Sequence, residues 1–207
     1  MAILPITVLG EPVLHTVADQ VTEFDADLEK FVADMVETMD AAHGVGLAAP
    51  QVGVGKQVFV WRYEGVADYD EEFFPDLELP EDAEKRVGVI INPRLVLSDL
   101  RQGELDEDLD AEGCLSIPGI YYPVRRYNDV VLEGQDVTGA PVRLDARGWL
   151  ARIWQHEFDH LQGVLFTERL EEPYLSQAKA EIEEAGYGRP GLVWDPSTLT
   201  EDDFEDD

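Results

Sequence analysis

The sequence predicts an α+β fold, in which small antiparallel or mixed β-sheets pack around a central helix that carries the pattern H-E-x-x-H. Three observations predict this class: an amphipathic helix near the N-terminus, a run of short β-branched strands after it, and then a helix that carries the chemistry. Strands that come together in the sequence and are followed by a helix are typical of an α+β domain. The 207 residues, 44% of them hydrophobic, are enough to bury one sizeable core.

Three helices are expected from apolar residues that recur three and four positions apart. The first spans about residues 25–42, the second carries apolar residues from Leu150 to Leu161, and a final helix covers residues 174–185. Gly163 is expected to stop the second helix. The candidate N-caps are Asp25 or Asp27 for the first helix and Asp145 for the second.

Segments rich in β-branched and aromatic residues are expected to form strands. Residues 57–63 make one strand, and residues 87–91 make another that should end at Asn92-Pro93. Residues 130–132 and 142–144 flank a Thr-Gly turn, which is the pattern of a β-hairpin. These strands supply the sheets of the predicted fold.

Acidic residues are concentrated in particular segments of the chain. Residues 64–86 read as an acidic loop insertion, and a second acidic connection over residues 104–112 runs straight into Gly113-Cys114. We expect a single domain over residues 1–192, followed by an acidic and flexible C-terminal tail over residues 193–207.

Charge and composition exclude several classes of partner. The formal net charge of −30, from 45 acidic and 15 basic residues, opposes binding to DNA or RNA, because phosphate binding needs clustered cations. No apolar run approaches the roughly 18 residues of a membrane helix, and the N-terminus lacks the features of a signal peptide. Cys114 is the only cysteine, so no internal disulfide is expected and a reducing, cytoplasmic location is favoured.

The strongest chemical motif is the segment Gln155-His-Glu-Phe-Asp-His160. Residues four apart on an α-helix lie one above the other, so His156 and His160 can hold one metal ion from the same face. Glu157 lies beside them, where it can accept a proton from water. The apolar residues of this helix indicate that it is buried, and buried histidines and carboxylates are costly unless they bind something. The motif therefore predicts a metal site.

A catalytic metal site normally has a third protein ligand and one open position. The longer metzincin pattern would end in a histidine where this chain has Phe166, and Glu181 lies at a distance compatible with thermolysin-like proteases. Cys114 is the better candidate because its setting, Glu112-Gly-Cys-Leu-Ser116, is unusual, and it would complete a Cys-His-His site for zinc or ferrous iron. Two alternatives stay open: a protease that uses Glu181, and a non-catalytic protein with a structural zinc.

Three segments together resemble one family. The segments that are similar to the three signature motifs of peptide deformylases, in the same order, are Gly44-Val-Gly-Leu-Ala-Ala-Pro-Gln51, Glu112-Gly-Cys-Leu-Ser116 and Gln155-His-Glu-Phe-Asp-His160. The likeness extends from Pro5 to about Leu170, and residues 188–192 resemble the tails of actinobacterial members. The resemblance implies a peptide deformylase-like fold and a hydrolase that removes the N-formyl group from the first methionine of new proteins, releasing formate.

The resemblance also implies a role for each site residue. The implied metal ligands are Cys114, His156 and His160. The implied catalytic groups are Glu157 as general base and then acid, with the side-chain amide of Gln51 and the backbone N–H of Leu115 as donors to the oxyanion. The residues expected to contact the substrate are Val45, Gly46, Glu112 and Ile153.

The resemblance favours Fe²⁺ as the ion bound in cells, with Zn²⁺, Ni²⁺ or Co²⁺ able to occupy the same site. N-formylmethionyl nascent peptides are the expected partners, extended along the backbone near Gly46. Some family members dock on the ribosome through a basic C-terminal helix, so a transient ribosome contact is conceivable here. The glutamates of the corresponding region in this chain argue against strong RNA binding.

Overall fold

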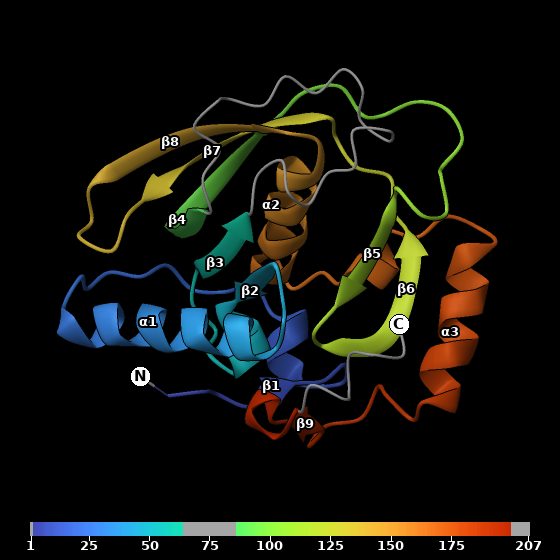
Figure 1. Cartoon of the computed structure of the whole chain (residues 1–207), viewed down its shortest axis with the longest axis horizontal. Helices are drawn as coiled ribbons and strands as arrows, with labels where there is room; N and C mark the ends of the chain where they lie inside the picture. The colour runs from blue at the N-terminus through green and yellow to red at the C-terminus, as the bar shows by residue number, and fades with distance from the viewer. Residues whose placement is uncertain (1, 64–85, 200–207) are drawn as a thin grey trace.

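The computed structural model describes residues 2–63 and 86–199, and its largest element is an antiparallel sheet with the strand order β2-β3-β4-β7-β8 (Figure 1). Two smaller antiparallel sheets pair β1 with β9 and β5 with β6. The strands are β1 (Ile6–Thr7), β2 (Gly46–Ala48), β3 (Val58–Tyr63), β4 (Arg86–Leu97), β5 (Ala111–Cys114), β6 (Ile117–Pro123), β7 (Asp129–Gln135), β8 (Pro141–Arg147) and β9 (Val193–Trp194).

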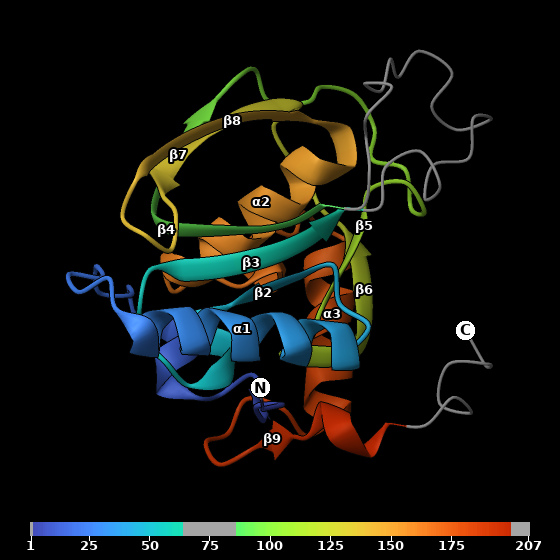
Figure 2. The ribbon, with the colours of Figure 1, turned by 60° about the vertical axis from the view of Figure 1, so that its left-hand side comes forward.

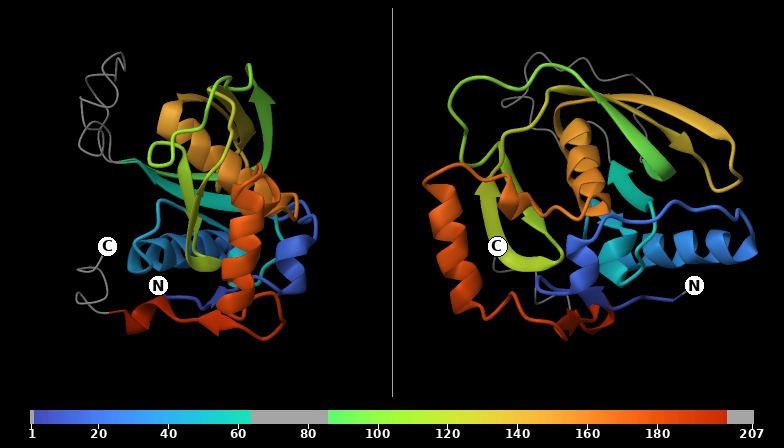
Figure 3. Two further views of the ribbon diagram at one scale, coloured as in Figure 1. Left: turned by 90° about the vertical axis from the view of Figure 1, so that its right-hand side faces the viewer. Right: turned by 180° about the vertical axis from the view of Figure 1, so that it is seen from behind.

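Three α-helices accompany the sheets in the described part of the chain: α1 (Ala26–Ala41), α2 (Gly148–Leu161) and α3 (Tyr174–Glu184). Helix α2 lies at the centre, between the five-stranded sheet and the β5–β6 hairpin (Figures 1 and 3). Helix α3 covers the outer side of that hairpin, and α1 runs alongside β2 and β3 (Figure 2). The predicted α+β fold is confirmed, with the H-E-x-x-H helix at its centre.

The alternation of side chains along β3 explains why α1 and α2 pack on opposite faces of it. Phe59 and Trp61 belong to the core under α2, where the rings of Trp61 and Trp154 meet with centroids 5.3 Å apart. Val58 and Val60 belong to a second core, which the apolar face of α1 closes from the other side. Helix α2 is therefore fixed between packed layers, and so is the motif that it carries.

Several of the expected elements are confirmed. Asp25 caps α1 by accepting hydrogen bonds from the backbone N–H groups of Asp27 and Leu28. The hairpin is formed by β7 and β8, and the final helix by α3. Gly163 follows the last turn of α2 with a φ of 70°, a conformation that glycine adopts without a steric cost.

The expected N-cap of α2 is wrong. Asp145 lies inside β8, paired with Val131 of β7, and the helix begins only after Arg147. The side chain of Arg147 makes no capping hydrogen bond. The tight passage from strand to helix is instead taken by Gly148, whose φ is 56°.

The expected end of β4 at Asn92-Pro93 is also wrong. The strand continues to Leu97, and its pairing with β7 shifts register between Ile91 and Arg94. The shift places the proline where no ladder hydrogen bond is required of it. Asn92 takes a φ of 50° and its side-chain amide bonds the backbone of Val21, which stabilises the irregular conformation.

The bounds expected for the acidic connection before Cys114 and for the C-terminal tail differ from those in the structure. Ala111 and Glu112 already belong to β5, so the connection before Cys114 is shorter than expected. Residues 193–199 were expected in the flexible tail, but Val193 and Trp194 form β9, which pairs with β1, and a short helical turn over Pro196–Thr198 follows. Of the insertion expected over residues 64–86, residues 64–85 lie outside the described residues, as do the last eight residues, while Arg86 already begins β4. None of the helices in the described ranges combines the length and the hydropathy that crossing a bilayer would need.

Candidate metal centre and active site

Two elements bring the three predicted metal ligands together. Cys114 ends β5, while His156 and His160 lie one turn apart on α2, with ring centroids separated by 5.1 Å. One ligand atom from each residue lies within 4.8 Å of the other two, and Cys114 Sγ is 3.3 Å from His160 Nε2. The predicted Cys-His-His grouping is therefore present in the fold.

The chemistry of these three side chains fits a divalent metal ion. A thiolate with two imidazoles is a donor set that zinc and ferrous iron both accept. Burial, together with the charges of His156 and Arg126, holds the pKa of His160 well below its usual value, so this imidazole is neutral, as a ligand must be. His160 Nδ1 is buried and has no hydrogen-bond partner among the described residues. Three protein ligands leave a coordination position open, which is typical of catalytic rather than structural sites.

The rival third ligands lie elsewhere. Glu181 is on α3, where its Oε1 accepts a hydrogen bond of 2.7 Å from the hydroxyl of Tyr122. It is not part of the cluster of potential ligands. Phe166 stacks against the ring of His156, with centroids 6.1 Å apart, and so packs the site without ligating it.

Glu112 fixes the orientation of one ligand. Its Oε2 lies 3.1 Å from Nδ1 of His156, so this nitrogen donates its proton to the carboxylate and Nε2 is the atom that would bind an ion. Arg126 donates two hydrogen bonds to the same carboxylate, at 2.9 and 2.8 Å, and Arg152 donates a third at 2.8 Å. Burial alone would raise the pKa of Glu112, but Arg126 and His156 outweigh it and hold the pKa well below its usual value.

The arginines extend this contact into a buried ionic network. Arg126 is 6% exposed and also donates to Asp159 Oδ2 at 2.6 Å, so it joins β5 to α2. Asp159 in turn accepts two hydrogen bonds from Arg169. Arg152 binds Asp110, whose side chain is fully buried, at 2.8 Å. The candidate ligands are thus supported by a network in which each buried charge has at least one partner of opposite sign.

Gln51 presents its amide group to the metal ligands. Its Oε1 accepts a hydrogen bond of 2.8 Å from the backbone N–H of Ala48, which fixes the orientation of the amide. The opposite end, Nε2, lies 3.6 Å from Cys114 Sγ. Gln51 is 1% exposed and belongs to the short helical turn Ala49–Val52. Its donor is therefore held in a defined position beside Cys114.

Glu157 packs against the backbone of β2. A Cβ atom on Gly46 would lie 2.3 Å from Oε1 of Glu157, so only glycine leaves room for this carboxylate. Glu157 is 4% exposed, and its Oε2 has no hydrogen-bond partner among the described residues. Burial raises the pKa of Glu157 to about 7, although the neighbouring His156 acts in the opposite direction.

A cavity of about 750 Å³ opens onto the cluster. Glu157, Gln51 and Cys114 all reach it, and its walls are more apolar than polar. All four residues that were expected to contact substrate line this cavity, namely Val45, Gly46, Glu112 and Ile153, and so does Leu115. The carboxylate of Glu112, however, is taken up by His156 and two arginines.

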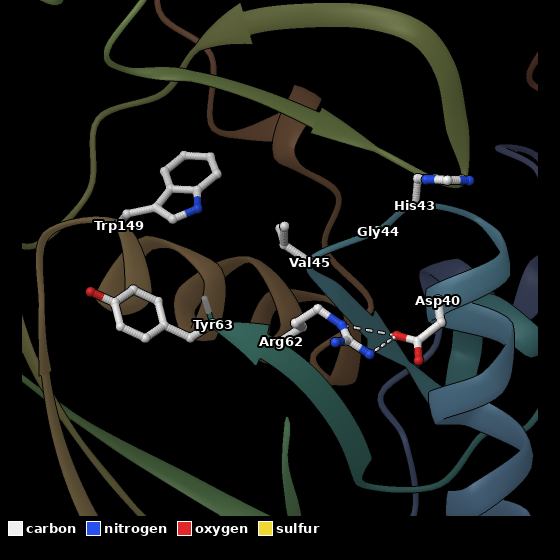
Figure 4. Close-up of a pocket in the computed structure, with 7 residues that line it drawn as sticks. All are labelled: Asp40, His43, Gly44, Val45, Arg62, Tyr63 and Trp149. Atoms are coloured by element: carbon white, nitrogen blue, oxygen red, sulfur yellow. Dashed lines mark hydrogen bonds and ion pairs between the residues drawn. The ribbon is translucent and has the colours of Figure 1, made fainter. Parts of the chain in front are cut away.

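A second hollow of about 470 Å³ adjoins the cavity. Figure 4 shows Trp149 and Tyr63 on one side of it and His43 on the other. Arg62 donates two hydrogen bonds to Asp40 along one wall, the Nε bond measuring 3.0 Å. The residues that line both spaces are His43, Gly44, Val45 and Trp149. The space available to a ligand therefore continues along the backbone that precedes β2.

Sequence reasoning missed the residues that support the site. Arg126 and Arg152 were not singled out, although Arg152 interrupts the apolar pattern of α2 between Leu150 and Ile153. A basic residue on the buried side of a helix, in a chain with only 15 basic residues, was an available signal. Nothing comparable in the sequence indicated that residues of the C-terminal segment, including Trp194, line the cavity.

Comparison with known proteins agrees with this geometry. The family model described as polypeptide deformylase matches residues 3–175. The peptide deformylase of Mycolicibacterium paratuberculosis is 44% identical over 201 residues, which cover 95% of both chains. That of Rhodococcus opacus is 42% identical over 207 residues, the whole of both. The crystal structure of a peptide deformylase from Synechococcus elongatus, in complex with actinonin, is 40% identical with a TM-score of 0.69, and the match covers 89% of this chain and 88% of that one.

These matches span the three motifs that supply the cluster, the buried carboxylate and the amide donor. Identity above 40% over nearly the full length of two relatives establishes more than a shared fold. The chain belongs to the polypeptide deformylase family, the enzymes that remove the formyl group from nascent peptides.

Proposed function

We propose that the enzyme hydrolyses the formyl amide of N-formylmethionyl peptides at the site formed by Cys114, His156 and His160. The observation that carries the proposal is the convergence of this cluster, Glu157 and Gln51 on one apolar cavity. A peptide deformylase from Acinetobacter baumannii, 32% identical, has been solved with Met-Ala-Ser bound, a peptide that begins with a free methionine. The test is formate release from formyl-Met-Ala-Ser by anaerobically purified ferrous protein. Inactivity with ferrous iron, nickel and cobalt alike would contradict the proposal.

Ferrous iron is the ion we propose for the cell, on the basis of the family resemblance and of the thiolate-imidazole donor set. Zinc, nickel and cobalt fit the same donors. An ion bound there would act as a Lewis acid, making water a nucleophile at neutral pH and drawing charge from the formyl oxygen.

Glu157 carries the proton in this proposal. Its carboxylate takes a proton from the attacking water, whose oxygen forms the new bond to the formyl carbon. When the C–N bond breaks, the same carboxyl group returns the proton to the departing amine, so that formate and a free N-terminus leave. The burial of Glu157 against Gly46 supports the role, because it excludes bulk water from the proton that is moved.

Gln51 and Leu115 are proposed to stabilise the oxyanion. The amide of Gln51 is already oriented by Ala48, so its Nε2–H group needs no rearrangement to donate. Leu115, which supplies the second proposed donor through its backbone N–H, directly follows Cys114 and lines the cavity. Donors fixed before the reaction stabilise the developing charge most effectively.

Replacing Gln51 with alanine should lower kcat by about 10²–10³, because one oxyanion donor is lost. Affinity for the product peptide Met-Ala-Ser, which lacks the formyl oxygen, should stay within about threefold of the parent, as should the metal content. Steady-state kinetics, titration with Met-Ala-Ser and metal analysis check this result. Full activity in Gln51→Ala would remove Gln51 from the mechanism.

The peptide is proposed to lie extended beside β2, which is an edge strand of the five-stranded sheet. Backbone groups near Gly46 would bond the main chain of the substrate, which makes recognition insensitive to the residues after methionine. Val45 and Ile153 line the cavity and suit an apolar side chain. Because its carboxylate is occupied, we assign Glu112 to orienting His156 rather than to contact with substrate.

The identity of the third ligand can be tested by a matched pair of substitutions. Cys114→Ser should weaken zinc binding by more than about 10-fold, since even residues that only orient a ligand cost 10–100-fold. Glu181→Ala should leave zinc affinity unchanged, because its carboxylate bonds Tyr122 instead. Competition with a chromogenic chelator measures both. Unchanged zinc affinity in Cys114→Ser together with weakened affinity in Glu181→Ala would instead support a protease that uses Glu181 as its third ligand.

A cytoplasmic location is proposed, in keeping with the family. We do not propose strong binding to ribosomal RNA, because the negative charge of α3 is unfavourable for contact with a polyanion. This helix carries one basic residue, Lys179, and three acidic residues, Glu181, Glu183 and Glu184. Any ribosome contact would have to use another surface or be transient.

A further inference from the structure

The C-terminal segment forms one wall of the active-site cavity, although it lies beyond residues 3–175, where the family model matches. The residues of this segment that line the cavity are Tyr187, Leu192, Val193, Trp194 and Leu199. Three of these residues, Val193, Trp194 and Leu199, belong to the stretch that was expected to be a flexible tail, and they line the space where the reaction is proposed to occur.

Backbone hydrogen bonds hold the segment against the N-terminal strand. Strand β9 pairs with β1, with Trp194 opposite Ile6. The N–H of Val8 bonds the carbonyl of Leu192 at 3.0 Å, and the N–H of Gly188 bonds the carbonyl of Leu9 at 2.8 Å. The position of Trp194 is therefore defined by the pairing of β9 and by main-chain bonds of the residues that precede it.

The side chain of Trp194 contacts the backbone of the residue that follows Cys114. Its indole Nε1–H donates a hydrogen bond of 2.8 Å to the carbonyl of Leu115, the residue after Cys114. Its ring packs against the core that α1 closes. The neighbouring carbonyl of Ser116 is held by the N–H of Leu9, also at 2.8 Å.

Leu115 and Ser116 form the turn between β5 and β6. The pairing of these strands is irregular at this end, with a register shift between Glu112 and Cys114 before Cys114 pairs with Ile117. The carbonyls of the turn are bonded from outside the hairpin, one by the N-terminal segment and one by Trp194. The hairpin thus relies on the two terminal segments of the fold for the placement of its tip.

We propose that Trp194 is a positioning residue for deformylation, which fixes the Leu115 backbone so that its N–H points at the developing oxyanion. The inference rests on the proposed role of that N–H. An oxyanion donor must lie about 2.7–3.1 Å from the charged oxygen, so a small rotation of the turn is enough to weaken it. Trp194 touches neither the ion nor the reacting atoms in this role, and acts through Leu115.

Trp194→Phe keeps an aromatic ring and removes the N–H donor. We expect kcat to fall about tenfold, while the Kd for Met-Ala-Ser stays within about threefold, because the product has no oxygen for the Leu115 N–H to bind. Tyr174→Phe is the matched control: it removes the hydroxyl that bonds Glu107, on a helix that lines no part of the cavity, and should leave kcat unchanged.

Hydrogen exchange gives a readout that needs no activity. In Trp194→Phe, amides in the peptide spanning residues 113–117 should exchange faster than in the parent, in metal-free and in zinc-loaded protein alike. The control should not change there. Unchanged exchange together with unchanged kcat would overturn the inference. A parent enzyme without formate release would instead refute the proposed function, and exchange alone would then decide the role of Trp194 in holding the turn.

Discussion

Glu157→Ala should lower kcat for formyl-Met-Ala-Ser by about 10²–10⁴ while the protein keeps its metal and its fold. The carboxyl group is the proposed carrier of the proton, and no other described carboxylate lies free beside the cluster, since Glu112 is bound by two arginines. Anaerobic formate assays, metal analysis and circular dichroism on the same preparation check the result. This is the largest fall in kcat that we expect among the substitutions proposed.

Two further variants sharpen this experiment. Glu157→Gln keeps the volume that packs against Gly46 and should be as slow as the alanine variant, because an amide cannot take the proton. Glu183→Ala removes an exposed glutamate of α3 and should match the parent. Activity in Glu157→Gln above a tenth of the parent value would show that another group moves the proton.

Arg126→Met should lower the free energy of unfolding by about 3 kcal/mol, which is the largest loss of stability we expect from a single substitution. The arginine is buried between Glu112 and Asp159, so its removal leaves two buried carboxylates with fewer counter-charges. Arg152 remains as a partner of Glu112, and Arg169 as a partner of Asp159. The expected loss is therefore at the lower end of the range of about 3–5 kcal/mol that is typical of a broken buried ion pair. Urea denaturation of metal-free protein measures it.

An exposed ion pair supplies the control for that experiment. Arg143 pairs with Glu133 across β7 and β8, and its side chain is 59% exposed. Arg143→Met should therefore change stability by less than about 1 kcal/mol. Arg126→Met should also weaken zinc binding, since Glu112 would orient His156 less firmly. Equal stability of the two variants would contradict the importance given to the buried network.

The sequence was sufficient for the chemistry that depends on local spacing. His156 and His160 were placed on one face of a helix by their separation alone, and the structure brings Cys114 to them. The same local reasoning failed for Asp145, because capping depends on where the chain leaves β8 and not on residue type. It also failed at Asn92-Pro93, where a register shift keeps a proline within a strand.

The ion pairs and hydrogen bonds that hold the site residues in place could not be predicted, because they join residues that are far apart in the chain. Glu112, Arg126 and Asp159 come from different elements, and nothing in their local sequence indicates which charge pairs with which. Trp194 likewise meets Leu115 only because β9 pairs with β1. Such partners follow from the three-dimensional arrangement, and the fold class alone does not specify them.

The contact between Gly46 and Glu157 constrains how this gene can change over generations. A side chain at position 46 would displace the carboxylate of Glu157, so we expect selection for the reaction to act against substitutions of Gly46. Once a duplicated copy has lost the glutamate, the steric barrier disappears and position 46 is free to drift. In copies that have lost the glutamate, glycine and larger residues are therefore both expected at position 46, whereas copies that keep Glu157 should keep Gly46.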